Sequence, residues 1–188
     1  MRIISGSVRG RQLVPLSGAD IRPTPDRVRE ALFSMLASRL GPLAGMHVLD
    51  LFAGSGALAL EALSRGAASA ILVDQGAQAV RVIPANINAC RMQEQATFIR
   101  SDVLKAIPRL AGKRFELIFL DPPYSQELVP PVLNAVAAFG LLASGGVICA
   151  ETDRRDAIPE VVGPFTRFDR RDYGSTAIHL FTCTEAEA

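Results

Sequence analysis

The sequence has no apolar run that approaches the ~20 residues required by a membrane-spanning helix, so a membrane protein is not expected. Its N-terminal stretch, MRIISGSVRGRQ, interrupts an apolar segment with Arg9 and Arg11, which argues against a secretory signal. Cysteine is scarce as well: Cys90, Cys149 and Cys183 are widely separated, odd in number and without metal-ligand spacing. We therefore expect reduced thiols in a cytoplasmic protein without a metal site.

Motifs for nucleotide phosphates are also absent. The turn DLFAGSG contains Gly54 and Gly56, but position 59 is Ala, so the third glycine of the dinucleotide motif GxGxxG is missing. Neither a Walker loop nor a zinc-binding cluster occurs. A dinucleotide is therefore not the ligand that this sequence favours.

Lysine is scarce, because eighteen of the twenty basic side chains are arginines. Residues 1–30 contain six of these arginines against three acids. Guanidinium groups suit phosphate, so a nucleic-acid surface near the N-terminus is one interpretation. The codon bias of a GC-rich genome is the other, and the counts alone do not separate the two. The six arginines are Arg2, Arg9, Arg11, Arg22, Arg27 and Arg29.

The hydrophobic pattern predicts an α/β fold. Residues 1–15 suggest a hairpin, and a helix should begin at about Pro25, with Thr24 as its cap and Pro25 at its first position. From residue 41 onward, short apolar runs alternate with helical segments, which indicates a mostly parallel sheet with helices on both faces. The segments 166–174 and 176–183 should close it as an antiparallel pair. We expect a basic N-terminal part, residues 1–40, packed on a main domain of residues 41–188.

Four successive strands of this sheet end in unusual residues. The first ends in the glycine turn after Asp50, and the others end at Asp74, at Ser101-Asp102 and at Asp121. Each end alone is compatible with ordinary turn chemistry, but ligands of such sheets bind beyond the carboxyl ends of the strands. Three acidic ends and one glycine pair fit the ribose and adenine of S-adenosylmethionine better than a pyrophosphate, which negative charge would repel.

The fourth strand end, in the stretch FELIFLDPPYS, combines an acid, two prolines and an aromatic ring. A strand that only had to end could use one glycine or one proline. An exocyclic amino group of a nucleobase is a poor nucleophile, because its lone pair is delocalised into the ring. Asp121 and the carbonyl of Pro122, held in place by Pro123, would accept its hydrogens and turn the lone pair toward an electrophile. Tyr124 offers a face on which an extruded base can stack. The stretch therefore predicts methyl transfer by alignment of the two reacting atoms.

These motifs together resemble a known family. DLFAGSG, Asp74, Ser101-Asp102 and DPPY are typical of amino-group methyltransferases that use S-adenosylmethionine. RIISGSVRGRQL, RPTPDRVREALFSML and GSGALALEALSRGA narrow the resemblance to the RsmD family, the bacterial 16S ribosomal RNA guanine-N2 methyltransferases. The similarity covers nearly the whole chain and weakens after about Glu151.

The resemblance implies a fold, a reaction and a partner. The fold is a seven-stranded Rossmann-like methyltransferase sheet, and the substrate is a guanine of 16S rRNA in the assembled or assembling 30S particle. We expect a monomer. The implied catalytic residues are Asp121, Pro122, Pro123 and Tyr124. The implied cofactor-binding residues are Asp50, Phe52, Ala53, Gly54, Ser55, Gly56, Asp74, Gln75, Ser101, Asp102 and Val103. The implied rRNA-binding residues are Arg9, Arg11, Arg22, Thr24 and Arg27.

Three other functions remain open. A DNA adenine-N6 methyltransferase shares the DPPY motif, although no target-recognition domain is evident. A protein glutamine methyltransferase would usually begin that motif with Asn. A non-catalytic RNA-binding assembly factor could retain a relic of the cofactor pocket.

Several other residues allow two interpretations. Glu61 could steady the cofactor loop or make a structural helix contact. Arg29 and Glu30 either form a solvated helix face or have a functional role. His179 is expected to be a packing or surface histidine. The arginines and aspartates of residues 169–172 indicate a solvated strand edge.

Overall fold

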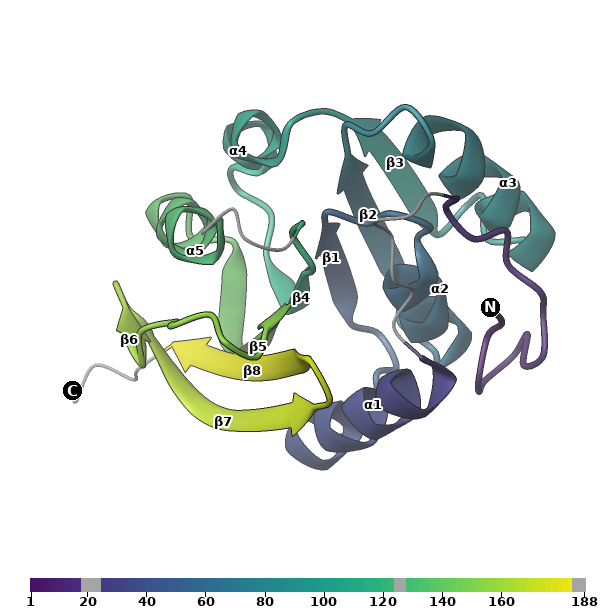
Figure 1. Cartoon of the computed structure of the whole chain (residues 1–188). Coiled ribbons are helices and arrows are strands. Elements are labelled where there is room, and N and C mark those ends of the chain that lie inside the picture. The colour runs from purple at the N-terminus through teal and green to yellow at the C-terminus, as the bar shows by residue number, and fades with distance from the viewer. Residues whose placement is uncertain (18–24, 124–127, 184–188) are drawn as a thin grey trace.

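The computed structural model describes residues 1–17, 25–123 and 128–183. In these ranges the strands form one eight-stranded sheet in the order β3-β2-β1-β4-β5-β8-β7-β6 (Figure 1). β1 to β5 pair in parallel, and β6, β7 and β8 add antiparallel pairs. The strands are β1 (His47–Leu51), β2 (Ser69–Asp74), β3 (Ala96–Arg100), β4 (Phe115–Leu120), β5 (Leu142–Asp153), β6 (Val161–Val162), β7 (Phe165–Tyr173) and β8 (Thr176–Cys183).

The expected mostly parallel sheet with an antiparallel closure is confirmed, but the expected count of seven strands is wrong by one. The additional strand is β6, which has two residues and pairs with the start of β7 at the edge of the sheet. So short a strand has no alternating apolar pattern that would reveal it in the sequence.

Helices cover both faces of the sheet (Figure 1). One face packs against α1 (Asp26–Leu40), α2 (Ala57–Ser64) and α3 (Ala79–Cys90), and the other packs against α4 (Val103–Ala106), the 3₁₀ helix η1 (Ile107–Leu110) and α5 (Val129–Ala138). Successive residues of β4 alternate between the two cores: Leu117 and Phe119 face the first, whereas Ile118 and Leu120 face the second. This double burial explains why the central strands are apolar at nearly every position.

The N-terminal segment makes fewer strand contacts than expected. Instead of a regular hairpin, residues 1–13 form a loop closed by one antiparallel bridge between Arg2 and Gln12. Helix α1 begins at Asp26, so Pro25 precedes its first turn instead of occupying it, and Thr24 lies outside the described residues. Leu32 belongs to the same core as the sheet. The division of the chain at residue 40 stays a prediction.

Arg29 is not part of a solvated helix face, which was one of its two interpretations. Its side chain is only 1% exposed. Its Nη2 donates to the Arg2 carbonyl oxygen and to Asp26 Oδ1, both at 2.7 Å. Arg29 therefore ties α1 to the N-terminal loop. Glu30, one position further, is exposed as expected of a solvated face.

The described part of the chain contains no helix with both the length and the apolar character needed to cross a bilayer. Within the same ranges, no group of three or more histidine, cysteine, aspartate or glutamate side chains is arranged to hold a metal ion. The three cysteines are unpaired, with Cys90 and Cys149 buried and Cys183 exposed.

Candidate active site

The sheet reverses its strand order between β1 and β4. β2 and β3 extend from one side of β1, whereas β5 extends from the far side of β4. The carboxyl end of β1 leads into the glycine turn, and that of β4 leads into Asp121-Pro122-Pro123. Asp121 donates its backbone N–H to the Leu51 carbonyl oxygen at 3.4 Å, so the two segments leave the sheet side by side. Such a switch point is where open α/β sheets bind their ligands.

The turn after β1 is a strained, close-packed loop. Phe52 has a φ of +68°, which is uncommon for a residue with a side chain, and such strained residues cluster at functional sites. Gly56 has a φ of +77° at the start of α2, and a Cβ atom there would lie 2.8 Å from Leu72 Cδ2. Ala53 is buried, whereas Gly54 and Ser55 are half-buried. The loop therefore needs glycine at position 56 for both its backbone conformation and its packing.

Asp74 and Asp102 lie at the ends of β2 and β3. Asp74 accepts the backbone N–H of Gly54 at 2.8 Å through one carboxylate oxygen and that of Gly76 at 2.7 Å through the other. Asp102 caps α4 by accepting the Lys105 N–H at 3.1 Å. The Ser101 N–H donates to the Asp74 carbonyl oxygen at 3.1 Å, which joins the two strand ends.

These bonds leave acceptor capacity at the rim, since each carboxylate oxygen has two lone pairs. Two further predicted cofactor residues differ in exposure: Gln75 is exposed, and Val103 is buried at the start of α4. The strand ends thus present two oriented carboxylates.

Asp50 lies beneath the loop instead of at its surface. It is 1% exposed, and its carboxylate accepts the Ala59 N–H of α2 at 3.2 Å. Burial, reinforced by the negative charge of Asp74, raises the pKa of Asp50 to about 7 against the ordinary 3.8. In the structure Asp50 therefore fixes the start of α2 relative to β1.

Replacement of Asp50 by Asn is expected to stabilise the protein increasingly as the pH rises from about 4 to about 7. Because the pKa of Asp50 is raised on folding, the folded state binds more protons than the unfolded state between about pH 4 and pH 7, so stability falls as pH rises through this window. The amide of the variant keeps an acceptor for Ala59 but cannot ionise. At 1.36 kcal/mol per pKa unit, the gain should reach at most about 4 kcal/mol at pH 8 and vanish near pH 4.

Urea unfolding of the ligand-free protein at both pH values measures this difference. If the substitution changes the unfolding free energy equally at pH 4 and pH 8, folding does not raise the pKa of Asp50, and the prediction is wrong.

Asp121 lies among acidic neighbours. Burial, with additional repulsion from the carboxylates of Glu151 and Asp50, raises its pKa well above the ordinary value. Pro122 is buried and Pro123 is exposed, while Tyr124 lies outside the described residues. Glu151, near the end of β5, was not assigned a role from the sequence. Its position at the end of the next strand along the sheet is the signal that could have identified it.

Glu61 holds the N-terminal loop against α2. It is fully buried, and its two carboxylate oxygens accept the backbone N–H groups of Ile4 and Ser5 at 2.7 and 3.0 Å. The Arg65 Nε donates to the same carboxylate at 2.7 Å. Of the two interpretations of Glu61, the structure thus shows the helix contact.

Asn86 of α3 connects the N-terminal segment to the glycine turn. Its side chain accepts the Val14 N–H at 2.8 Å and donates to the carbonyl oxygens of Val14 at 3.0 Å and Ser55 at 2.9 Å. The Ser17 N–H donates to Gln78 Oε1 at 2.8 Å at the other end of this stretch. Residues 14–17 are therefore fastened beside the loop that leads into α2.

The predicted RNA-binding arginines are distributed over the N-terminal part. Arg9 and Arg11 are exposed on the N-terminal loop, and Arg27 is exposed on α1. Arg22 and Thr24 lie outside the described residues. The arginines and aspartates of β7 pair with each other, Arg170 with Asp172 at 3.1 Å among them, as expected for a solvated strand edge.

The rim fits an adenosine-containing ligand without phosphates. Its groups are the close-packed backbone of the glycine turn and the carboxylates of Asp74 and Asp102, with the buried Val103 at the start of α4. None of the predicted cofactor residues is basic, so a pyrophosphate would find no counter-charge among them. Diols and amino groups, in contrast, donate hydrogen bonds that carboxylates accept.

Comparison with known proteins identifies the family. The family model described as "Conserved hypothetical protein 95" matches residues 1–182. The Escherichia coli (strain K12) protein named "Ribosomal RNA small subunit methyltransferase D" is 33% identical over 181 residues, which cover 96% of this chain and 89% of that one. A Bacillus subtilis (strain 168) protein provisionally described as the rRNA methyltransferase YlbH is 38% identical over 184 residues, covering 96% and 98%.

A solved structure agrees with these sequences. An Escherichia coli protein provisionally described as the methyltransferase yhhF superposes with a TM-score of 0.84 at 32% identity, and the match covers 97% of each chain. The class I methyltransferase fold is thereby shown. The motifs of the glycine turn and of Asp121-Pro122-Pro123, the matching family model and the full-length relatives agree, and this chain belongs to the RsmD family of methyltransferases.

Proposed function

We propose that this protein transfers a methyl group from S-adenosylmethionine to the exocyclic N2 amino group of a guanine in 16S rRNA. The observation that carries the proposal is the pairing of the glycine turn after β1 with Asp121-Pro122 after β4 at the switch point. The name of the Escherichia coli relative, a small-subunit rRNA methyltransferase, supports the substrate class.

The proposed cofactor site uses the rim of β1 to β3. Asp74 would accept the ribose hydroxyls, Asp102 the adenine amino group, and the turn from Phe52 to Gly56 would contact the cofactor through its backbone. Gln75, Ser101 and Val103 would complete the site, with Asp50 below as its support. When bound, S-adenosylmethionine supplies an electrophilic methyl group and leaves as a neutral thioether.

The chain's own contribution is to orient the amino group and to receive its proton. Asp121 and the Pro122 carbonyl would accept its two hydrogens, which leaves the nitrogen lone pair directed toward the methyl donor. The raised pKa of Asp121 makes its carboxylate a stronger proton acceptor than an ordinary aspartate. The proton lost by the nitrogen then goes to Asp121 or to water. Tyr124 would stack on the base.

The proposed RNA contacts lie on the N-terminal part, which Glu61 and Asn86 attach to the cofactor side of the sheet. Arg9, Arg11 and Arg27 would contact phosphates, together with Arg22 and Thr24. We further propose that the substrate is the assembled or assembling 30S particle in the cytoplasm, and that the protein acts as a monomer without a metal.

Labelled methyl transfer to small-subunit particles tests the proposal. The particles come from a strain that lacks the gene, and the modified nucleoside is identified by mass analysis. We expect N2-methylguanosine at one position of 16S rRNA and no transfer to duplex DNA in a parallel reaction. N6-methyladenine in the DNA would favour the DNA enzyme instead. Cofactor binding by calorimetry without any transfer would favour a non-catalytic assembly factor.

A further inference from the structure

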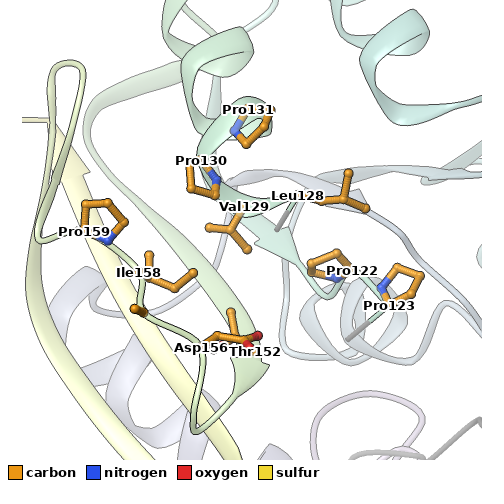
Figure 2. Close-up of a pocket in the computed structure, with 11 residues that line it drawn as sticks. Pro122, Pro123, Leu128, Val129, Pro130, Pro131, Thr152, Asp156, Ile158 and Pro159 are labelled. Carbon is orange, nitrogen blue, oxygen red and sulfur yellow. The ribbon is translucent and has the colours of Figure 1, made fainter. Parts of the chain in front are cut away.

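A pocket of about 400 Å³ lies between the end of β4, the start of α5 and the loop that follows β5. Most of its walls are apolar, and Figure 2 shows the proline rings and aliphatic side chains around it, which include Pro122, Pro123, Val129, Pro130, Ile158 and Pro159. Two polar side chains, Thr152 and Asp156, lie together at one end of the pocket (Figure 2). A mostly apolar cavity with a few polar groups is the usual form of a small-molecule or cofactor site.

Thr152 belongs to a chain of hydrogen bonds that runs from Arg167 through His179. The arginine determines which atom of each pair is the donor. Arg167 Nη1 lies 3.3 Å from His179 Nδ1, and His179 Nε2 lies 3.0 Å from Thr152 Oγ1. A guanidinium has donors only, so His179 Nδ1 must accept, and its Nε2 must carry the ring hydrogen. Burial and the charge of Arg167 lower the pKa of His179 to about 4, which agrees with a neutral ring.

The hydroxyl of Thr152 consequently has no hydrogen to give to a ligand. Its oxygen accepts from His179 Nε2, and its own hydrogen is donated to the Asp153 carbonyl oxygen at 3.1 Å. One lone pair remains. Thr152 is 3% exposed, so neighbouring side chains hold it in this orientation. Toward the pocket, Thr152 can act only as an acceptor.

Asp156 supplies acceptors at the same end of the pocket. It is half-buried, and Oδ2 accepts the Asp153 N–H at 3.2 Å, which orients the carboxylate through one of its two oxygens. Asp153 is itself paired with Arg155 at 2.9 Å, so this turn is braced from both sides. The polar end of the pocket therefore presents hydrogen-bond acceptors and no donor from either Thr152 or Asp156.

A guanine carries two adjacent donors on its Watson–Crick edge, N1–H and the N2 amino group. Adenine has an amino donor there but an unprotonated N1, which would face an acceptor with a lone pair. With the proposed function as its basis, we infer that Asp156 and Thr152 select guanine by accepting the N1 hydrogen while Asp121 and Pro122 hold the N2 amino group. Enzymes read extruded bases by hydrogen bonds to this edge.

The base 2-aminopurine separates the two interactions. It retains the amino group at the same ring position, but it lacks O6, and its N1 has a lone pair and no hydrogen. Because O6 is missing for the wild type and the variants alike, a change in the rate ratio on substitution of Asp156 reports on N1. A site built to accept a hydrogen from its substrate strongly rejects an analogue that lacks it, because the buried acceptor is left unpaired. The wild-type enzyme should therefore methylate guanine at least about 100-fold faster than 2-aminopurine.

The test uses small-subunit particles reconstituted with 16S rRNA that contains a synthetic segment, with guanine or 2-aminopurine at the methylated position. Asp156→Asn introduces an amide hydrogen that can donate to N1 of 2-aminopurine. Its guanine-to-2-aminopurine rate ratio should fall to about tenfold or less. Asp169→Asn changes a carboxylate on β7 that pairs with Arg171, away from the pocket, and should keep the wild-type ratio.

The outcomes separate the inference from the proposed function. A wild-type enzyme that leaves the guanine particle unmethylated would overturn the function itself. Methylated guanine with an unchanged ratio in Asp156→Asn overturns the inference alone. If that variant does not fold, Thr152→Val decides: a selective loss of the guanine rate supports the inference, and an equal loss on both bases refutes it.

Discussion

Replacement of Asp121 by Asn is expected to reduce single-turnover methyl transfer by about 10²- to 10⁴-fold, the range that removal of a general base usually costs. An amide side chain still offers one acceptor oxygen, but it cannot receive a proton. The wild-type rate should also fall as pH decreases through the raised pKa of Asp121, because the protonated carboxyl keeps one acceptor oxygen but can no longer receive a proton. The Asp121→Asn variant should not show this fall in rate at low pH.

Cofactor affinity is the control for this prediction. Asp121 follows β4, whereas the proposed cofactor residues lie at the ends of β1, β2 and β3, so calorimetry with S-adenosylmethionine should give similar affinities for both proteins. A variant with wild-type turnover, or one that loses cofactor binding and transfer together, would be incompatible with the role assigned to Asp121.

The second large effect is expected at Gly6 in the N-terminal loop. Its φ is +87°, and a Cβ atom there would lie 1.8 Å from the Ser64 carbonyl oxygen on α2. That oxygen accepts the Ser7 N–H at 2.7 Å, so it cannot move away without loss of the bond. Gly6→Ala should detach the loop that carries Arg9 and lower transfer to 30S particles by about tenfold or more, since phosphate contacts dominate such affinity.

Gly10 provides a matched control in the same loop. Its φ of +82° is nearly the same, but a Cβ atom at this position would meet nothing within 4 Å. Gly10→Ala therefore carries only the backbone cost of about 1–2 kcal/mol for a left-handed residue. Hydrogen exchange of the Ile4 and Ser5 amides should show lost protection in Gly6→Ala alone. Equal effects of the two substitutions would mean that contact with α2 does not fasten the loop.

The central sheet could be predicted from the sequence because its signals are local. Each of β1 to β4 is a short apolar run that ends in turn-forming or acidic residues, and such a run is enough to predict a buried strand. The acidic strand ends also follow from topology, because parallel strands bring their carboxyl ends to one edge. β6 could not be predicted, since two residues have no periodicity, and the burial of Arg29 depends on the distant carbonyl of Arg2.

Site residues could be predicted from the sequence only where a short motif comes directly after an apolar strand. Asp74 and Asp121 were predicted in this way, and the structure places both at strand ends, while their roles stay predictions. The structure adds that Asp50 is buried below the loop. The polar end of the pocket was not found. Thr152 and His179 are 27 residues apart and become partners only when β5 pairs with β8. His179 was correctly expected to be a packing histidine, but its bond to Thr152 has no signature in the sequence.

A structure of the protein with S-adenosylhomocysteine and its rRNA substrate is the most direct test of how the amino group is aligned. We predict that the N2 nitrogen of one extruded guanine lies within hydrogen-bond distance of both the Asp121 carboxylate and the Pro122 carbonyl oxygen, beside the cofactor sulfur. A bound base whose amino group contacts neither oxygen, or whose other edge faces the sulfur, would contradict the account.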